Sequence, residues 1–201
     1  MKIGPKYKIA RRLGAPVFEK TQSPKYTLSL ARKDKADRGR GRPKSEYGLA
    51  MLEKQKTRYS YGLTESQFRI YVNKALRAGK PVEKLFVLLE TRLDNALYRA
   101  GLAKTRSAAR QVAGHGHTLV NGRRVTIPSI GVKIGDKLSL REGSRESALF
   151  SEVSERMRSL SMPVWIKVDP ETRMAEIIGD PVYVPGEQLF DLGVAIEFYN
   201  R

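Results

Sequence analysis

The sequence has 201 residues, and its 38 Lys plus Arg against 21 Asp plus Glu give a formal net charge of +17. It contains no Cys, which excludes disulfide scaffolds, thiolate metal sites and cysteine nucleophiles. The longest unbroken apolar run, residues 85–89, is far shorter than the roughly 20 residues of a membrane-spanning helix. The start of the chain also lacks the apolar core of a secretory signal, so we expect a soluble, cytoplasmic protein.

The charge is unevenly distributed. Residues 1–60 hold 17 basic and 5 acidic side chains, residues 61–150 hold 16 and 7, and residues 151–201 hold 5 and 9. A merely solvated surface is the plain alternative, but such surfaces intersperse the two signs. A long basic block indicates a polyanionic partner, and the acidic end indicates a second partner with a basic protein surface.

Residues 1–45 contain few apolar anchors, among them Ile9, Leu13 and Phe18, and are expected to fold poorly alone. Residues 38–44, Arg-Gly-Arg-Gly-Arg-Pro-Lys, contain no apolar side chain and cannot recover their ordering entropy by burial. We expect this stretch to order on a partner, with phosphates as suitable ligands for its guanidiniums. A disordered linker with incidental charge is the alternative.

Helical signals begin at Ser45, a candidate N-cap followed by apolar residues, including Met51, at helical spacing. Residues 64–67, Thr-Glu-Ser-Gln, match a capping box before a second helix. The apolar spacing over residues 85–100 predicts one continuous helix that ends at Gly101.

The next segment predicts a small α/β unit. A helix is expected from Thr105 or Ser107 to Gly114, and residues 118–127 predict a hairpin with Asn121-Gly122 as its type I′ turn. Further strands are expected, as is a short helix over 151–160. The expected strands or extended segments are 132–134, 137–140, 164–168, 174–178 and 194–199. The predicted fold class is α+β.

No constellation for catalysis is evident. The only histidines, His115 and His117, lack nearby Cys or an acidic pair, so contact with phosphate or bases is favoured over a zinc site or a plain capping role. Asp94 lies beside Arg92 and Arg99 on the predicted helix and is expected to pair with them. Nucleotide-binding glycine motifs and the nucleophile elbow are absent from the sequence, so we predict no catalytic residue, metal site or cofactor.

Residues 92–110, Arg-Leu-Asp-Asn-Ala-Leu-Tyr-Arg-Ala-Gly-Leu-Ala-Lys-Thr-Arg-Ser-Ala-Ala-Arg, are followed by Val120-Asn-Gly122 and Gly135-Asp136. This pattern closely resembles the RNA-binding module of the S4 superfamily, which also occurs in tyrosyl-tRNA synthetases, pseudouridine synthases and a heat-shock RNA-binding protein. The flanks narrow the resemblance. Gly4-Pro-Lys-Tyr near the start and Ile196-Glu-Phe-Tyr-Asn-Arg201 at the end are similar, with the segments between them, to the bacterial small-subunit ribosomal protein S4 family.

Two features depart from that family. Some members carry Cys-x-x-Cys, the start of a zinc site, where this chain has Tyr7 and Ala10. The family's usual Pro-Gly-Gln-His-Gly stretch is replaced by the sequence at 38–42, which puts the contacts of that stretch in doubt.

The resemblance implies a primary 16S rRNA-binding protein that nucleates 30S assembly at a helix junction of the 5′ domain, without catalysis and without a small-molecule substrate. It implies a basic arm (1–45), a helical domain (46–90, completed by 180–201) and an α/β RNA-binding domain (91–179, with a core module at 91–142). The expected rRNA contacts are Lys6, Lys8, Arg11, Arg12, Lys54, Lys56, Arg58, Arg92, Lys104, Arg106, Arg110, His117, Asn121, Arg123, Arg124 and Lys133.

Other partners follow from the same resemblance. Arg40, Arg42 and Lys44 would line the channel by which mRNA enters, beside small-subunit ribosomal protein three. The acidic residues Glu187, Asp191 and Glu197 would include contacts to small-subunit ribosomal protein five that affect decoding accuracy. A free-standing RNA chaperone and an RNA-modifying enzyme with the same module are the alternatives, and fold alone does not separate them.

Overall fold

The computed structural model describes residues 3–34 and 45–200. The chain forms two compact units, which are described separately: unit 1 comprises residues 1–85 and 184–201, and unit 2 comprises residues 86–183. The predicted arm thus falls in the same unit as the predicted helical domain, and the boundary lies inside a helix a few residues before position 90. The functional division into three parts stays a prediction.

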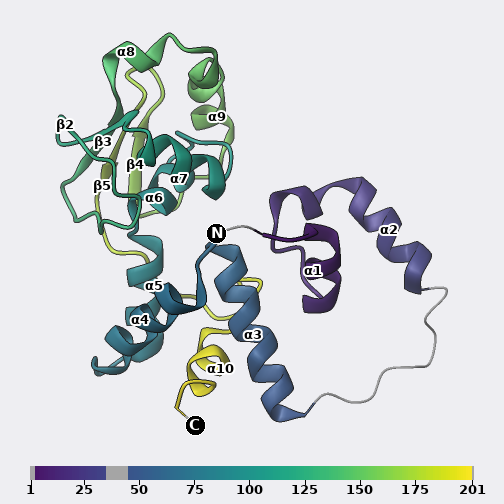
Figure 1. Cartoon of the computed structure of the whole chain (residues 1–201). Helices are drawn as coiled ribbons and strands as arrows, with labels where there is room; N and C mark the ends of the chain where they lie inside the picture. Colours follow the sequence, from purple (N-terminus) through teal and green to yellow (C-terminus); the bar gives the residue numbers. More distant parts are fainter. Residues whose placement is uncertain (1–2, 35–44, 201) are drawn as a thin grey trace. The chain divides into compact units, whose positions relative to one another are not determined.

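Unit 1 is helical (Figure 1). Its elements are α1 (Lys6–Leu13), the 3-10 helix η1 (Glu19–Gln22), α2 (Pro24–Asp34), α3 (Glu46–Ser60), α4 (Glu65–Leu76), the first half of α5 (Pro81–Glu90) and α10 (Leu192–Glu197). The N-caps predicted from local sequence are confirmed. The Ser45 side chain accepts a hydrogen bond from the amide of Gly48, and Thr64 and Gln67 form the reciprocal capping box.

The first 34 residues contain a small hydrophobic cluster of their own. Leu13, Phe18 and Tyr26 are all buried, and the Thr21 hydroxyl fixes the turn between them by donating to the Phe18 carbonyl oxygen at 2.6 Å. Side chains of α3 pack against the cluster and complete it. Residues 3–34 are therefore folded in the whole chain with contacts from apolar residues of α3, and the expectation that they fold poorly alone stays a prediction.

Helix α3 buries a polar face. Lys54 and Thr57 are buried, whereas Leu49 and Met51 are 52% and 38% exposed. Leu49 and Met51 thus lie at the surface of the predicted helix. The reason is that α3 packs against α10 through a network of polar and aromatic groups.

The prediction of an extended segment at 194–199 is wrong. The Asp191 carboxylate accepts hydrogen bonds from the amides of Gly193 and Val194, and so starts helix α10. This helix buries Ala195 and Ile196, which pack beside α3. The short stretch alternates enough to imitate a strand, but the cap and the docking surface on α3 favour the helix.

Unit 2 joins helices to an antiparallel sheet. The helices are the second half of α5, α6 (Leu93–Arg99), α7 (Arg106–Gly114), α8 (Glu142–Arg145), η2 (Ala148–Phe150) and α9 (Val153–Ser159). The strands are β1 (Thr118–Val120), β2 (Arg123–Arg124), β3 (Lys137–Leu140), β4 (Ile166–Asp169) and β5 (Met174–Ile177), in the spatial order β2-β1-β3-β5-β4. The predicted α+β class is confirmed.

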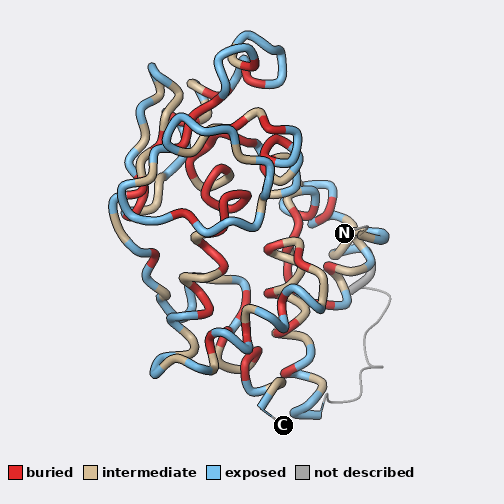
Figure 2. Tube along the Cα trace, turned by 60° about the vertical axis from the view of Figure 1, so that its left-hand side comes forward, coloured by how far each residue is buried: buried red, intermediate tan, exposed pale blue. Residues whose placement is uncertain are grey.

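One core lies between the helices and the sheet of unit 2. Leu97 of α6, Leu138 and Leu140 of β3, and Ile177 of β5 are at most 1% exposed. Buried segments recur along the trace in Figure 2, and in unit 2 they come from both helices and strands. The sheet thus supplies one wall of the core and leaves its edge strand β2 exposed.

The continuous helix predicted for residues 85–100 is broken at Thr91 and Arg92. Arg92 is extended (φ −62°, ψ 138°) and forms an isolated bridge with Gly131. The amide of Val132 donates to the Thr91 carbonyl oxygen at 2.8 Å. Pairing with this distant segment overrides the local helical pattern and also prevents residues 132–134 from forming the predicted strand.

Candidate nucleic-acid interface

A charged network joins α5, α6 and α7 in unit 2. The Asp94 carboxylate accepts hydrogen bonds from Arg92 (Nε–Oδ1 3.0 Å, Nη2–Oδ2 2.8 Å) and from Arg110 (Nε–Oδ2 2.8 Å). The Glu90 carboxylate accepts from Arg99 (Nε–Oε2 and Nη2–Oε1, both 2.9 Å). Both carboxylates are at most 2% exposed. Charge-assisted, bidentate contacts of this kind hold the guanidinium planes in fixed orientations.

The network keeps an excess of positive charge. Arg106 donates from Nε to the Asn95 Oδ1 at 2.7 Å, lies 3.9 Å from Glu90 and covers the Tyr98 ring. Four guanidiniums therefore surround two carboxylates. The side chains of Arg99, Arg106 and Arg110 remain 29%, 21% and 29% exposed, so the surplus charge lies at the surface.

One prediction about this region needs correction. Asp94 pairs with Arg92 as expected, but its second partner is Arg110. Arg99 pairs with Glu90 instead, because Asp94 and Arg99 are five positions apart in α6 and lie on different faces of the helix. Arg92 is only 3% exposed and organises the start of α6, and its predicted RNA contact stays a prediction that this burial opposes.

The hairpin has the predicted type I′ turn, since Asn121 and Gly122 both have positive φ angles (51° and 76°). The Asn121 side chain donates from Nδ2 to Asp136 Oδ1 at 2.7 Å and accepts from the Lys137 amide at 2.9 Å. Asn121 thus ties the turn to β3. Its predicted role as an RNA contact remains a prediction beside this structural one.

Exposed cations surround this turn. Arg123, Arg124 and Lys133 are all exposed. Arg124 donates from Nη2 to the His115 carbonyl oxygen at 3.1 Å and lies so close over Gly116 that a Cβ at that position would collide with the guanidinium. Arg124 therefore ties the cationic hairpin to the backbone directly after α7.

The remaining predicted residues of unit 2 differ in accessibility. His117 is half-buried, with Nδ1 2.9 Å from Ser144 Oγ and its ring edge-on to Phe150, so it supports the fold locally. Lys104 is 75% exposed and only 3.9 Å from the equally open Glu152. Within residues 3–34 and 45–200, no group of three or more potential metal-ligating side chains comes together.

In unit 1, the predicted cations of α1 lie at or near the surface. Lys8 and Arg12 are exposed, one turn apart. Arg11 donates from Nε to the Tyr7 carbonyl oxygen at 3.2 Å, and Lys6 lies 5.8 Å from the centre of the Phe18 ring. The outer face of α1 is therefore cationic, and its inner face is apolar.

The predicted cations of α3 are largely committed within the unit. Lys54 is 6% exposed, donates to Glu65 at 3.1 Å and lies 4.1 Å from the centre of the Phe198 ring. Its ammonium therefore joins α3 to α4 and α10, and its predicted RNA contact stays a prediction that this burial opposes. Lys56 donates to Glu53 at 2.6 Å, and its side chain is 19% exposed.

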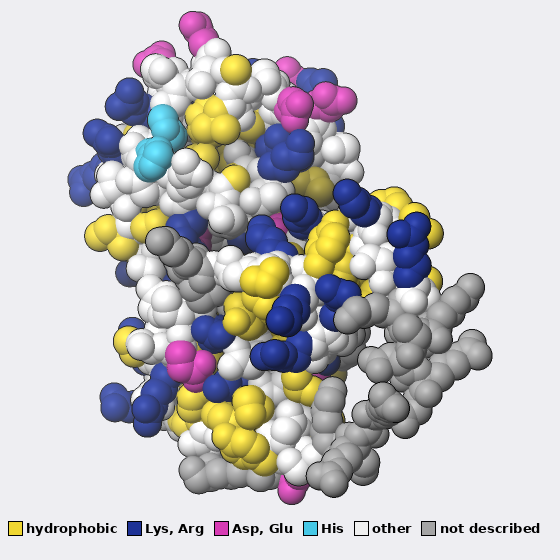
Figure 3. Space-filling view, turned by 45° about the vertical axis from the view of Figure 1, so that its right-hand side comes forward, with side chains coloured by type: hydrophobic (Ala, Val, Ile, Leu, Met, Phe, Trp, Pro, Cys, Tyr) yellow, Lys and Arg dark blue, Asp and Glu magenta, His cyan; other side chains and the backbone are white. Residues whose placement is uncertain are grey.

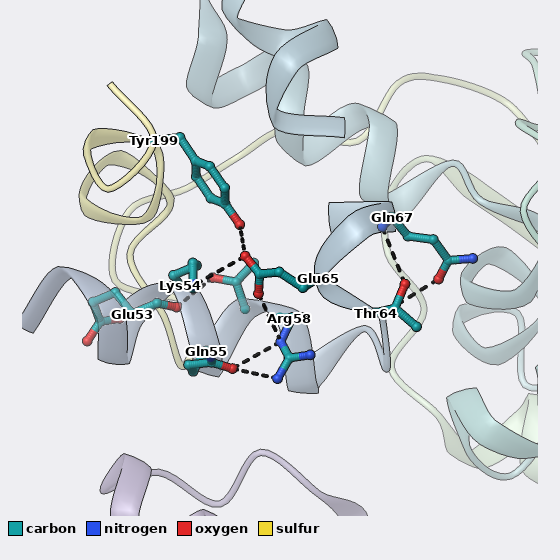
Figure 4. Close-up of polar contacts among 9 residues, drawn as sticks. Glu53, Lys54, Gln55, Arg58, Thr64, Glu65, Gln67 and Tyr199 are labelled. Carbon is teal, nitrogen blue, oxygen red and sulfur yellow. Dashed lines mark hydrogen bonds and ion pairs between the residues drawn. The ribbon is translucent and has the colours of Figure 1, made fainter. Parts of the chain in front are cut away.

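Glu65 lies at the centre of the contacts in Figure 4. It accepts a hydrogen bond from the Tyr199 hydroxyl at 2.6 Å and lies 3.7 Å from Arg58, besides its bond to Lys54. Burial opposes ionisation of Glu65, but the hydrogen bonds from Tyr199 and Lys54 outweigh it and hold the pKa of Glu65 below its ordinary value. Burial and the bond to Glu65 raise the pKa of Tyr199.

The acidic residues near the end have different roles. Glu187 and Glu197 are exposed, whereas Asp191 caps α10 and donates its amide to Glu53 at 2.9 Å. Arg40, Arg42 and Lys44 lie outside the described residues.

The sequence did not indicate that Glu90, Asn95 and Tyr98 hold the arginines of α6 and α7 in place. A single sequence carries no local signal for such pairings.

Figure 3 shows a face with many more Lys and Arg than Asp and Glu side chains. In the parts of the chain that the structure describes, no helix is both long and apolar enough to cross a membrane. The excess of cations on the face in Figure 3 agrees with a surface suited to a polyanion.

Comparison with known proteins covers almost the whole chain. Residues 1–90 match the family model for the ribosomal protein S4/S9 N-terminal domain, and residues 91–138 match the model for the S4 domain. The small ribosomal subunit protein uS4 of Roseiflexus castenholzii is 39% identical, over 99% of this chain and 98% of the relative. The uS4 proteins of Persephonella marina and Latilactobacillus sakei are 41% and 39% identical, each over 98% of both chains.

Proposed function

Because the chain belongs to the small ribosomal subunit protein uS4 family, we propose that it binds 16S rRNA and is a structural constituent of the 30S subunit. The observation that carries the proposal is the surplus of oriented guanidiniums on α6 and α7, connected to the exposed cations of the hairpin. Such cations release counterions and hold phosphates that would otherwise repel one another. In this role the protein is ribosome-bound in the cytoplasm and performs no catalysis.

The proposed site on unit 2 consists of surface cations supported by buried carboxylates. Arg106 and Arg110 are held by the network, and Arg123 and Lys133 extend from the hairpin. Folded RNA is recognised mostly by its shape and phosphates, because its deep groove is closed to side chains. The fixed planes of Arg106 and Arg110 suit a rigid RNA junction.

The first test measures binding to a 5′-domain rRNA fragment and to an unrelated structured RNA of equal length, over a salt series. We expect a preference of at least a hundredfold, about 3 kcal/mol, that persists as salt rises. Equal affinities that fall together with salt would contradict specific rRNA binding and favour the RNA-chaperone alternative.

A pair of variants locates the contact. Arg123→Ala removes a cation from β2, at one edge of the sheet, and Lys167→Ala removes one from β4, at the other edge. The slope of log K against log salt is negative. If the hairpin holds a phosphate, Arg123→Ala reduces the magnitude of this slope by about 1, whereas Lys167→Ala leaves it unchanged. Equal slopes for the two variants would contradict this placement.

Two further contacts belong to the proposal. Arg40, Arg42 and Lys44 would line the mRNA channel beside small-subunit protein three, and their joint change to Ala should impair unwinding of structured mRNA while rRNA binding persists. Glu187 and Glu197, which are exposed, would face small-subunit protein five together with Asp191. Charge reversal at Glu187 or Glu197 should alter misreading in cells, and unchanged accuracy and assembly would argue for a merely solvated surface.

A further inference from the structure

Helix α3 exposes apolar side chains that the proposed phosphate contacts do not explain. Tyr47, Leu49 and Met51 are 50%, 52% and 38% exposed, but they point in different directions. Tyr47 packs against Phe198, with ring centres 5.3 Å apart, and Leu49 lies about 200° around the helix from Met51. Met51 and Leu52 leave an apolar surface on α3 beside α1.

Part of this surface forms a groove between α1 and α3, both in unit 1. Its volume is about 560 Å³, within the range of sites that bind small organic groups. Ile9, Met51 and Tyr59 contribute apolar lining, and Lys8 and Arg12 contribute cations from α1. Among the described residues that line it, none is acidic.

Arg58 gives the groove an oriented, flat wall. Its Nε and Nη2 donate to Gln55 Oε1 at 3.0 and 2.7 Å, it lies 3.7 Å from Glu65, and its guanidinium carbon is 4.6 Å from the centre of the Tyr59 ring. Figure 4 shows Gln55 and Glu65 on either side of this guanidinium. Because the Gln55 oxygen faces Arg58, the amide NH2 of Gln55 is the donor that this side chain offers elsewhere.

We propose that this groove receives an unpaired nucleobase of the bound RNA, with the flanking phosphates on Lys8 and Arg12. The inference rests on the proposed rRNA binding and adds contact with a base to contacts with phosphates. The ring of a nucleobase matches the apolar lining of the groove, and its hydrogen-bonding edge matches the Gln55 amide. The anionic backbone of the nucleotide matches the cations of α1. Unstacked bases in RNA–protein complexes pack on aromatic rings and guanidinium planes.

An apolar protein segment would fill the same lining but would leave Lys8 and Arg12 without counter-charge. An RNA strand supplies that charge at every nucleotide. The surrounding segment is also strongly basic, with 17 Lys and Arg against 5 Asp and Glu in residues 1–60. Charge complementarity therefore favours RNA as the occupant.

Photo-crosslinking of the full chain bound to 5′-domain rRNA tests the occupant. A photoreactive p-benzoylphenylalanine replaces Met51 in one variant and Leu49 in its control, because both are exposed on α3 but only Met51 lines the groove. We expect the variant at 51 to crosslink to one unpaired nucleotide with at least five times the yield of the variant at 49. Crosslinks to paired nucleotides, or equal yields from the variants at positions 51 and 49, would overturn the proposal. A crosslink from position 51 to protein instead of RNA in assembled subunits would also overturn it.

Binding affinity supplies a second test. Met51→Glu and Leu49→Glu change the net charge equally at exposed positions of one helix, and thermal unfolding of both variants checks their fold. We expect Met51→Glu to weaken rRNA binding at least tenfold more than Leu49→Glu. If both variants lose the same affinity while the wild-type protein still prefers the 5′-domain rRNA, only the proposed base contact in the groove is overturned. If the wild-type protein itself shows no such preference, the proposed function is overturned as well.

Discussion

The two units use buried charge differently. Unit 2 buries the carboxylates of Glu90 and Asp94 together with Arg92. Each carboxylate is also paired with one guanidinium that reaches the surface, Arg99 on Glu90 and Arg110 on Asp94. Unit 1 buries a cation, Lys54, and pairs it with Glu65, whose side chain is 45% exposed. In unit 2 the buried acid orients cations toward solvent, whereas in unit 1 the buried cation holds helices together. The same ion-pair chemistry therefore orients surface cations in one unit and forms an internal joint in the other.

Removing a buried carboxylate from unit 2 should cause the largest loss of stability. Asp94→Ala leaves Arg92, which is 3% exposed, without its carboxylate, and we expect a loss of about 3–5 kcal/mol in the free energy of unfolding. Urea unfolding followed by circular dichroism measures this loss. Glu171→Ala is the control, since it removes the exposed pair with Arg158 and should cost less than about 1 kcal/mol. If both changes lowered the free energy of unfolding by a similar, small amount, the buried carboxylate of Asp94 would contribute no more stability than the exposed one of Glu171.

The cluster of the first 34 residues should be the next most sensitive feature. Tyr26 is 3% exposed and its ring centre lies 5.2 Å from that of Tyr7, so Tyr26→Ala should cost about 3 kcal/mol by leaving a cavity. Proteolysis and thermal unfolding would report the loss. Because the Cys-x-x-Cys positions of some relatives are Tyr7 and Ala10 here, we expect a metal chelator to leave wild-type stability unchanged. A chelator effect comparable to that of Tyr26→Ala would refute a purely apolar cluster.

The joint in unit 1 should respond to pH. Since the folded state lowers the pKa of Glu65 from its ordinary 4.5, ionised Glu65 stabilises the fold above that value, and the contribution is lost as pH falls through the lower folded pKa. Tyr199→Phe removes one hydrogen bond to this carboxylate and should cost about 1 kcal/mol at pH 7. The difference between wild type and variant should shrink in unfolding experiments below pH 4.5. A difference that stays constant down to a pH at which NMR shows Glu65 to be protonated in the folded state would exclude Glu65 as its source.

Features fixed by a few neighbouring residues could be predicted from the sequence. The capping box at Thr64 and the Asn121-Gly122 turn depend on local side chains and backbone angles, and both are confirmed. The break at Arg92 depends on a segment near Gly131, and the Asp94–Arg110 and Glu65–Tyr199 contacts join residues 16 and 134 positions apart. The site was therefore predicted as a set of basic residues, but its division into buried organisers and surface cations was not.

The smallest expected effect separates a satisfied polar group from an unsatisfied one. Thr21 in unit 1 and Thr118 in unit 2 are both at most 2% exposed, but only the hydroxyl of Thr21 is hydrogen-bonded, to the amide and the carbonyl oxygen of Phe18. Within the described residues, the Thr118 hydroxyl oxygen has no hydrogen-bond partner. Replacing a buried, unpaired hydroxyl with a methyl group removes a desolvation penalty, so Thr118→Val should leave unfolding unchanged or stabilise the protein by up to about 1 kcal/mol.

Thr21→Val makes the same chemical change where the hydroxyl is bonded, and should cost about 1–2 kcal/mol because the Phe18 amide loses its acceptor. Paired urea titrations of the two variants measure the contrast. If Thr118→Val destabilised the protein as much as Thr21→Val, the Thr118 hydroxyl would have to be bonded in solution, for example to a bound water, and the distinction between the two threonines would fail.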